Sequence, residues 1–155
     1  MLKYYFPRID ELKPGFKYEK FDKSWVSKVL TIDDIGKKSF QDLVKLIVDK
    51  KFNEIRVPVL NGSDFNKYGF NEVTGTYLGN TKSRLFRRSK FEITFLDGKK
   101  EPFITIRDTK ENVILFCGNC ISDQVLRELL ITLDIIVPEY IVKIFDQDYY
   151  DWKEE

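Results

Sequence analysis

The most regular pattern of apolar and polar positions lies between residues 39 and 51. Apolar side chains recur there at helical spacing, at Phe40, Leu43, Val44, Ile47 and Val48. This spacing places them along one side of a helix. Ser39 stands at an N-cap position and Asp42 follows three residues later, as in a capping box. The pattern predicts a helix over residues 39–51 that packs one face against a sheet.

Residues 54–60 alternate between apolar and polar positions, with Ile55, Val57 and Val59 on the same side. Alternation with a period of two predicts a half-buried strand. Pro58 has no N–H group to donate to a neighbouring strand, so we expect this strand near the edge of its sheet.

Residues 83–133 have the order strand, turn, strand, turn, strand, helix. Apolar residues alternate over 91–95, Asp97-Gly98 predicts a hairpin turn, and residues 103–107 form the return strand. Residues 113–117 are continuously apolar, which predicts a central strand covered on both faces. A helix should follow, capped by Ser122. Its buried face should comprise Val125, Leu126, Leu129, Leu130 and Leu133.

Other segments are less regular. Residues 1–23 follow no sustained period, and Ser24 is a candidate cap for a short helix that extends to residue 30. Residues 61–82 form a long connection rich in Gly, Asn and Thr, of a kind that often carries function. Residues 138–145 are compatible with either a helix or a strand.

Together these elements predict an α+β fold, with one antiparallel sheet of about three to five strands packed against two or three helices. The 155 residues are expected to form a single domain, with 147–155 as an acidic tail. Hydrophobic residues make up 43% and aromatic residues 15% of the chain. That composition predicts a bulky aromatic core, with an aromatic contact surface as the functional alternative.

Histidine is absent from the chain. This excludes a Ser-His-Asp triad, a Cys-His pair and histidine metal ligands within it. The sequence has neither a run of 18 apolar residues nor an apolar secretory segment near Met1, so we expect a cytoplasmic protein without a membrane span. No arrangement of side chains indicates a catalytic site, a metal or a cofactor, and we therefore expect a protein that is not an enzyme.

Both cysteines lie in one Cys-x-x-Cys motif, at Cys117 and Cys120, between a predicted strand and a predicted helix. This context is shared with thiol redox motifs, in which the positive end of a helix stabilises a thiolate. Asn119 and the position of Pro138 differ from a thioredoxin pattern, and Ser122 is the better helix cap. A single pair of cysteines also supplies only two of four zinc ligands. A buried structural role is therefore the main expectation, with redox chemistry as an alternative.

Residues 82–100 form a basic segment with seven Lys or Arg residues against two acidic ones. Such side chains release counterions from phosphates, and nearby aromatic rings can stack on bases. The whole chain carries a net charge of only +1, unlike a dedicated nucleic-acid-binding protein. A nucleic-acid or phosphate-binding module is therefore an alternative function. Its candidate residues are Lys82, Arg84, Arg87, Arg88 and Lys90.

The end of the chain is acidic and aromatic, with seven acidic residues against two lysines over 134–155. Tyr and Trp are favoured interface anchors, and carboxylates around them steer a basic partner. The candidate partner-binding residues are Asp146, Asp148, Tyr149, Tyr150, Asp151 and Trp152. The leading prediction is a non-catalytic protein-binding domain, and its most concrete version is an immunity- or antitoxin-like inhibitor of a basic toxin.

Overall fold

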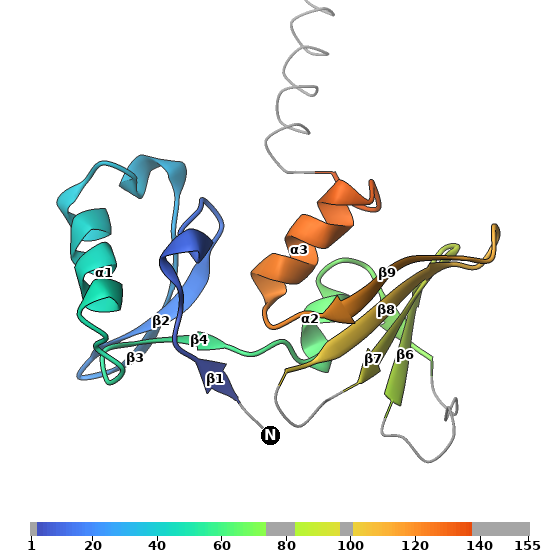
Figure 1. Cartoon of the computed structure of the whole chain (residues 1–155), viewed down its shortest axis with the longest axis horizontal. Coiled ribbons are helices and arrows are strands. Elements are labelled where there is room, and N and C mark those ends of the chain that lie inside the picture. Colours follow the sequence, from blue (N-terminus) through green and yellow to red (C-terminus); the bar gives the residue numbers. More distant parts are fainter. Residues whose placement is uncertain (1–2, 74–82, 97–100, 138–155) are drawn as a thin grey trace, which may run out of the picture.

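The computed structural model describes residues 3–73, 83–96 and 101–137 (Figure 1). It contains two antiparallel sheets, of four and five strands, together with three α-helices. The predicted α+β class, with antiparallel strands packed against helices, is confirmed. The strands are divided between two sheets, whereas the sequence pattern indicated one.

The first sheet has the strand order β1-β4-β2-β3. Its strands are β1 (Tyr4–Tyr5), β2 (Lys17–Asp22), β3 (Ser24–Val29) and β4 (Ile55–Pro58). Helix α1 (Lys38–Val48) covers one face, and the short 3₁₀ turns η1 (Ile9–Glu11) and η2 (Ile32–Asp34) complete this half. The buried residues between α1 and the sheet are Phe16, Leu30, Leu43, Ile47, Ile55 and Val57.

The short helix predicted to start at Ser24 is wrong, because this segment is strand β3. It pairs with β2 from Lys17↔Val29 to Asp22↔Ser24, and Lys23 forms the turn with a φ of 61°. Trp25 and Val26 favour strands, since branched and aromatic side chains fit a pleated surface. Residues 1–23, for which no period was found, contain β1, η1 and β2.

The edge position expected for the strand at 54–60 is also wrong. Strand β4 lies between β1 and β2, and Ile55, Val57 and Val59 are buried as predicted. Pro58 is tolerated because it pairs with Tyr4 at a non-hydrogen-bonded position, where the flanking Val59 N–H donates to the Lys3 carbonyl at 2.9 Å. The pairing of β4 with β2 ends before Pro58, at Arg56.

Helix α1 confirms a helix in this segment, with Leu43 and Ile47 of the predicted stripe buried. It ends at Val48, which is 63% exposed rather than buried, and Leu46 packs against the core instead. The prediction that Ser39 caps this helix is wrong, because Ser39 lies inside the first turn. Lys37 holds the N-cap position, and its side chain makes no capping hydrogen bond. Capping boxes occur instead at Thr31–Asp34 and Asn61–Asp64, where they start η2 and α2 (Gly62–Asn66). Ser-x-x-Asp alone therefore did not identify a helix start.

The second sheet has the order β5-β6-β7-β8-β9. Its strands are β5 (Asn71–Glu72), β6 (Ser83–Arg88), β7 (Phe91–Leu96), β8 (Phe103–Asp108) and β9 (Val113–Asn119). Helices α2 and α3 (Asp123–Thr132) lie on the face turned toward the first sheet (Figure 1). The largest fully buried side chains of this half include Phe65, Phe70, Phe86, Ile93, Ile104, Ile106, Leu126 and Leu130.

The predicted antiparallel pairing of β7 with β8 is confirmed, from Phe91↔Asp108 to Leu96↔Phe103. The Asp97-Gly98 turn lies outside the described residues. The polar turn after β8 is present, since the Asp108 carboxylate accepts hydrogen bonds from the Lys110 and Glu111 N–H groups at 3.0 and 3.1 Å. Such local bonds let a short polar side chain close a turn.

The central position predicted for residues 113–117 is wrong. Strand β9 is at the edge of the sheet, β7 is at its centre, and Ile114 is 62% exposed. An irregularity in pairing at Ile106/Arg107 shifts the register of β9, and only Leu115 and Phe116 of its apolar run contact the core. A continuous apolar run thus does not require burial on both faces.

Helix α3 is confirmed as predicted. The Ser122 hydroxyl accepts a hydrogen bond from the Val125 N–H at 3.3 Å, and Leu126 and Leu130 are fully buried. Val125, Leu129 and Leu133 pack against the same core. The choice between helix and strand for 138–145 lies outside the described residues.

Candidate functional site

The acidic–aromatic residues predicted to bind a partner lie outside the described residues. Asp146, Asp148, Tyr149, Tyr150, Asp151 and Trp152 therefore stay a prediction from the sequence.

The basic segment is distributed over different parts of the second sheet. Side chains alternate between the two faces of a strand, so Arg84 and Arg88 lie on one face of β6 and Arg87 lies on the other. Arg84 pairs with Glu72, with its Nε and Nη2 atoms 2.8 and 2.7 Å from the carboxylate oxygens. Arg87 pairs with Glu92 across the β6–β7 ladder. The fold therefore does not gather these cations into one phosphate-binding face.

Lys90 and Lys82 complete the predicted anion-binding set. The Lys90 ammonium lies 3.3 Å from the Asp108 carboxylate, and this contact helps to hold the Asp108 pKa below its usual range, after the larger effect of the Glu111 N–H bond. Lys82 lies outside the described residues. Internal carboxylates thus neutralise most of the described part of the basic segment.

Arg88 is the exception, because the fold brings it beside two cations that the sequence pattern did not single out. A hollow of about 530 Å³ is lined by Lys67, Tyr68, Gly69, Arg88, Arg127, Ile135, Ile136 and Val137. We call it the basic hollow. Its cations are Lys67 at the C-terminal end of α2, Arg88 of β6 and Arg127 of α3. These residues are far apart in the sequence, so only the tertiary structure reveals the basic hollow.

The two cysteines occupy different environments. Cys117 is exposed on β9, whereas Cys120 is fully buried just before α3, and both are free thiols. Burial, followed by the charge of Asp123, raises the pKa of Cys120 to about 12. A thiol with this pKa is protonated at neutral pH and is a poor nucleophile. Ser122, rather than a cysteine, caps α3.

The first sheet carries a partly exposed cluster that sequence reasoning missed. Arg56 of β4 lies between two rings, 3.6 Å from the Tyr4 ring centre and 4.0 Å from that of Trp25. The Phe21 ring is in edge contact with Trp25, at 5.4 Å between centres. Glu19 pairs with the Arg56 guanidinium at 2.7 Å. We call Tyr4, Glu19, Phe21, Trp25 and Arg56 the aromatic–arginine face.

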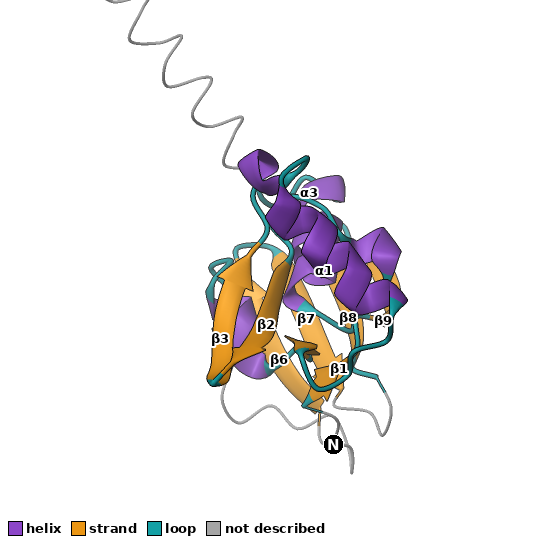
Figure 2. Cartoon of the chain, turned by 90° about the vertical axis from the view of Figure 1, so that its left-hand side faces the viewer, coloured by secondary structure: helices purple, strands orange, loops and turns teal. Residues whose placement is uncertain are grey.

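Strand pairing explains how these residues meet. Glu19 is opposite Arg56, and Phe21 is opposite Trp25, and side chains of directly opposed residues share a face. This face is the reverse of the one that α1 covers, where Ile55 and Val57 are buried. Phe21 is 46% exposed, and β3 lies at the outer edge of its sheet (Figure 2). The sequence feature that could have indicated this face is the Asp22-Lys23-Ser24 turn, which lies between two segments with aromatic residues.

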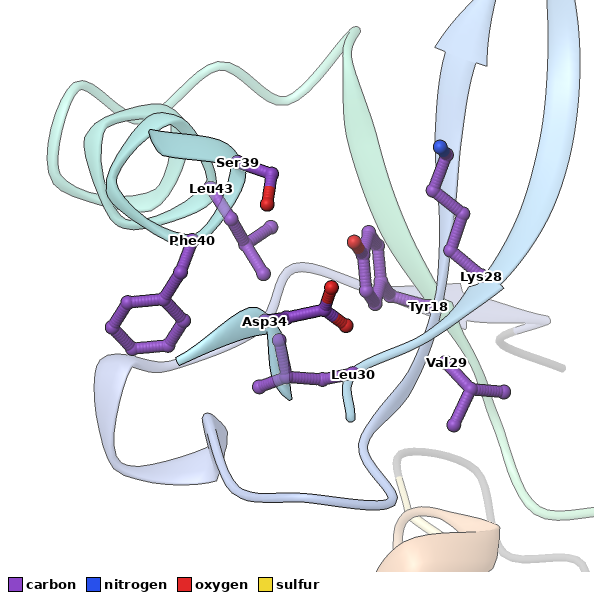
Figure 3. Close-up of a pocket in the computed structure, with 8 residues that line it drawn as sticks. All are labelled: Tyr18, Lys28, Val29, Leu30, Asp34, Ser39, Phe40 and Leu43. Carbon is purple, nitrogen blue, oxygen red and sulfur yellow. The ribbon is translucent and has the colours of Figure 1, made fainter. Parts of the chain in front are cut away.

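A second hollow, of about 270 Å³, lies between α1 and the β2–β3 hairpin. Figure 3 shows the Tyr18 hydroxyl, the Asp34 carboxylate and the Ser39 hydroxyl turned toward it. One Asp34 oxygen accepts hydrogen bonds from the Thr31 N–H and hydroxyl, both at 2.8 Å, which lower the Asp34 pKa. Burial and the Asp34 charge raise the pKa of Tyr18. Asp34 therefore serves the cap of η2, and Tyr18 is a neutral hydroxyl at physiological pH.

Within the described ranges, no cluster of three or more Cys, Asp or Glu side chains is arranged to hold a metal ion. None of the helices in the described part of the chain has the length and apolar character needed to cross a membrane. Searches against protein-family models, curated proteins and solved structures found no match to this chain.

Proposed function

We propose that the chain is a non-catalytic, cytoplasmic protein-binding domain that contacts its partner through the aromatic–arginine face. The observation that carries this proposal is the Arg56 guanidinium held between Tyr4 and Trp25 on a sheet face that α1 leaves uncovered. Trp, Tyr and Arg dominate the binding energy of protein interfaces. Their ring stacking also fixes the side chains before binding, which lowers the entropy lost on association.

The edge of β3 supports the same proposal. This strand has six residues, has a neighbour on one side only within the described sheet, and carries the exposed apolar residues Val26 and Val29. An edge strand can pair with an extended segment of another protein through its backbone groups. We propose that the partner adds a strand along β3 and places apolar side chains against Phe21 and Trp25.

The finer version of the proposal is an immunity- or antitoxin-like inhibitor of a basic toxin. Its support is the composition of residues 134–155, where carboxylates surround Tyr149, Tyr150 and Trp152. Carboxylates on an inhibitor can occupy the place of substrate phosphates in a basic nuclease. A toxin gene beside the gene for this chain would add further support.

The test compares capture of partners from native host extract by the immobilised wild-type chain and by a Phe21→Ser variant. Partner affinity, then measured with the purified proteins, should fall about tenfold or more in F21S. Val48→Ser is the matched control, because Val48 is 63% exposed on α1, which covers the opposite face of the sheet. Equal affinities of F21S and wild type would reject the aromatic–arginine face.

A chain lacking residues 147–155 tests the toxin-inhibitor version separately. If the acidic end binds a basic toxin, the deletion should weaken that complex. Unchanged affinity of the deletion variant would reject the acidic end as the contact surface and leave the aromatic–arginine face as the site.

The two alternatives have less support. Carboxylates of the chain pair with Arg84, Arg87 and Lys90, which reduces the attraction of residues 82–100 for a nucleic-acid backbone. For thiol redox chemistry, the high pKa of the buried Cys120 works against the exchange of a Cys117–Cys120 disulfide.

A further inference from the structure

The basic hollow combines three cationic side chains with an apolar wall. Lys67, Arg88 and Arg127 contribute the cations, and none of the described residues that line the hollow is acidic. Ile135 is buried in the core, and Ile136 and Val137 continue the apolar surface at the end of α3. A site with positive charge on one side and apolar surface on the other suits a ligand with the same two parts.

The two arginines are the least neutralised of these cations. Within the described ranges, neither Arg88 nor Arg127 forms an ion pair with a carboxylate. Arg88 donates one hydrogen bond through Nη1 to the Tyr68 carbonyl at 3.0 Å, which positions its guanidinium beside the hollow. The Arg127 guanidinium lies close to Gly15, where an added Cβ would come within 2.9 Å of Nη1.

Lys67 is held in place by acidic neighbours outside the lining of the hollow. Its ammonium lies 2.9 Å from Asp64 and 3.8 Å from Asp123. Burial lowers the pKa of Lys67, but these two carboxylates outweigh that effect and raise it, so the ammonium keeps its proton at neutral pH. Tyr68 donates its hydroxyl to Asp123 at 2.7 Å and stays neutral, so it adds no negative charge to the hollow.

The backbone at Gly69 also belongs to the site. Gly69 has a φ of 83°, and an added Cβ would lie 3.4 Å from the Arg88 Cδ atom. The glycine therefore provides the left-handed turn, and Arg88 crosses the backbone there at van der Waals distance.

We infer that the basic hollow binds a small organic phosphate, with the phosphate between Arg88, Arg127 and Lys67 and the apolar body against Ile135 to Val137. Guanidinium groups bind phosphate oxygens through paired, charge-assisted hydrogen bonds, which favours a dianion over a single carboxylate. The volume of about 530 Å³ is that of a pocket for a small molecule. This site is independent of the aromatic–arginine face.

The test is a titration of the full chain with phenyl phosphate, followed by NMR at the amide signals of Tyr68 and Gly69. We expect saturable shifts, with binding that weakens as salt rises from about 20 to about 200 mM. Inorganic phosphate and benzyl alcohol each carry only one half of the ligand, and both should bind several-fold more weakly. Tight binding of inorganic phosphate would overturn the role of the apolar wall.

The variants Arg127→Gln and Arg87→Gln separate the hollow from general surface charge. R127Q should bind phenyl phosphate about tenfold more weakly. R87Q removes a charge one position from Arg88 on the opposite face of β6 and should bind as the wild type does. Arg127 makes no ion pair in the described structure, so R127Q should keep the wild-type melting temperature. An equal loss in both variants, or no saturable shift in the wild type, would overturn the proposal.

Discussion

At the scale of single residues, one serine has a structural role that its position alone predicts. Ser122 is 4% exposed, and its hydroxyl accepts the Val125 N–H at the start of α3. Ser39 occupies a similar sequence context but lies inside the first turn of α1 and is exposed. The difference follows from the backbone: a cap needs an extended residue before the first turn, which Ser122 has with φ −141° and ψ 163°.

Replacing each serine by alanine measures that difference. Ser122→Ala should lower the free energy of unfolding by about 1 kcal/mol, since a helix N–H loses its acceptor. Ser39→Ala should change it by less than about 0.5 kcal/mol, as for exposed sites without a cap. Urea denaturation followed by circular dichroism checks both values, and equal losses would contradict the assignment of Ser122 as the cap.

At the scale of elements, the face of the sheet on which a strand residue lies decides how much its apolar side chain contributes. Ile93 in the central strand β7 is fully buried, whereas Ile114 in the edge strand β9 is 62% exposed. Both are isoleucines in the same sheet, but Ile93 is opposite Ile106 on the core face, whereas Ile114 is opposite Arg107 on the other face. Their contributions to stability therefore differ because of burial and not because of residue type.

The same substitution in both strands tests this. Ile93→Ala should lower the free energy of unfolding by about 2–5 kcal/mol, because it removes buried methyl groups and leaves a cavity. Ile114→Ala should cost less than about 1 kcal/mol, mainly through strand propensity. Guanidinium denaturation at one temperature gives both values. A loss in I114A as large as in I93A would place β9 in the interior of the protein.

At the scale of the whole molecule, Asp123 connects the two sheets. Its carboxylate accepts hydrogen bonds from Lys17 of β2 at 2.9 Å and from Tyr68 at 2.7 Å. Nearby, the Leu60 N–H donates to the Ile121 carbonyl at 2.9 Å. The segment after β4 thereby joins the start of α3, so contacts between residues distant in sequence hold the halves together (Figure 1).

Two variants measure the Asp123 contacts. Lys17→Met should cost less than about 1 kcal/mol, because the Lys17 side chain is 46% exposed and water screens the pair. Asp123→Ala should cost more, about 1–3 kcal/mol, because the half-buried Tyr68 hydroxyl also loses its acceptor and the first turn of α3 loses a negative charge. Thermal unfolding of both variants and of the double variant checks these values. Equal losses of stability in K17M and D123A would contradict the central role of Asp123.

The sequence by itself determined the features that depend on neighbouring residues. The apolar stripe of α1, the Ser122 cap and the apolar face of α3, and the pairing of β7 with β8 all follow from local period and turn chemistry. Each depends on residues that are close together in the chain. These features also establish the α+β class.

Only the tertiary structure decided the features that depend on which surfaces meet. The apolar run of β9 fits a central strand as well as an edge strand, and only the strand order shows that β9 lies at the edge. Arg56 reaches Tyr4 and Trp25 because β4 lies between β1 and β2, and Arg88 and Arg127 line one hollow because α3 packs on the sheet that contains β6. Both candidate surfaces combine segments far apart in the chain, and no local pattern encodes such contacts.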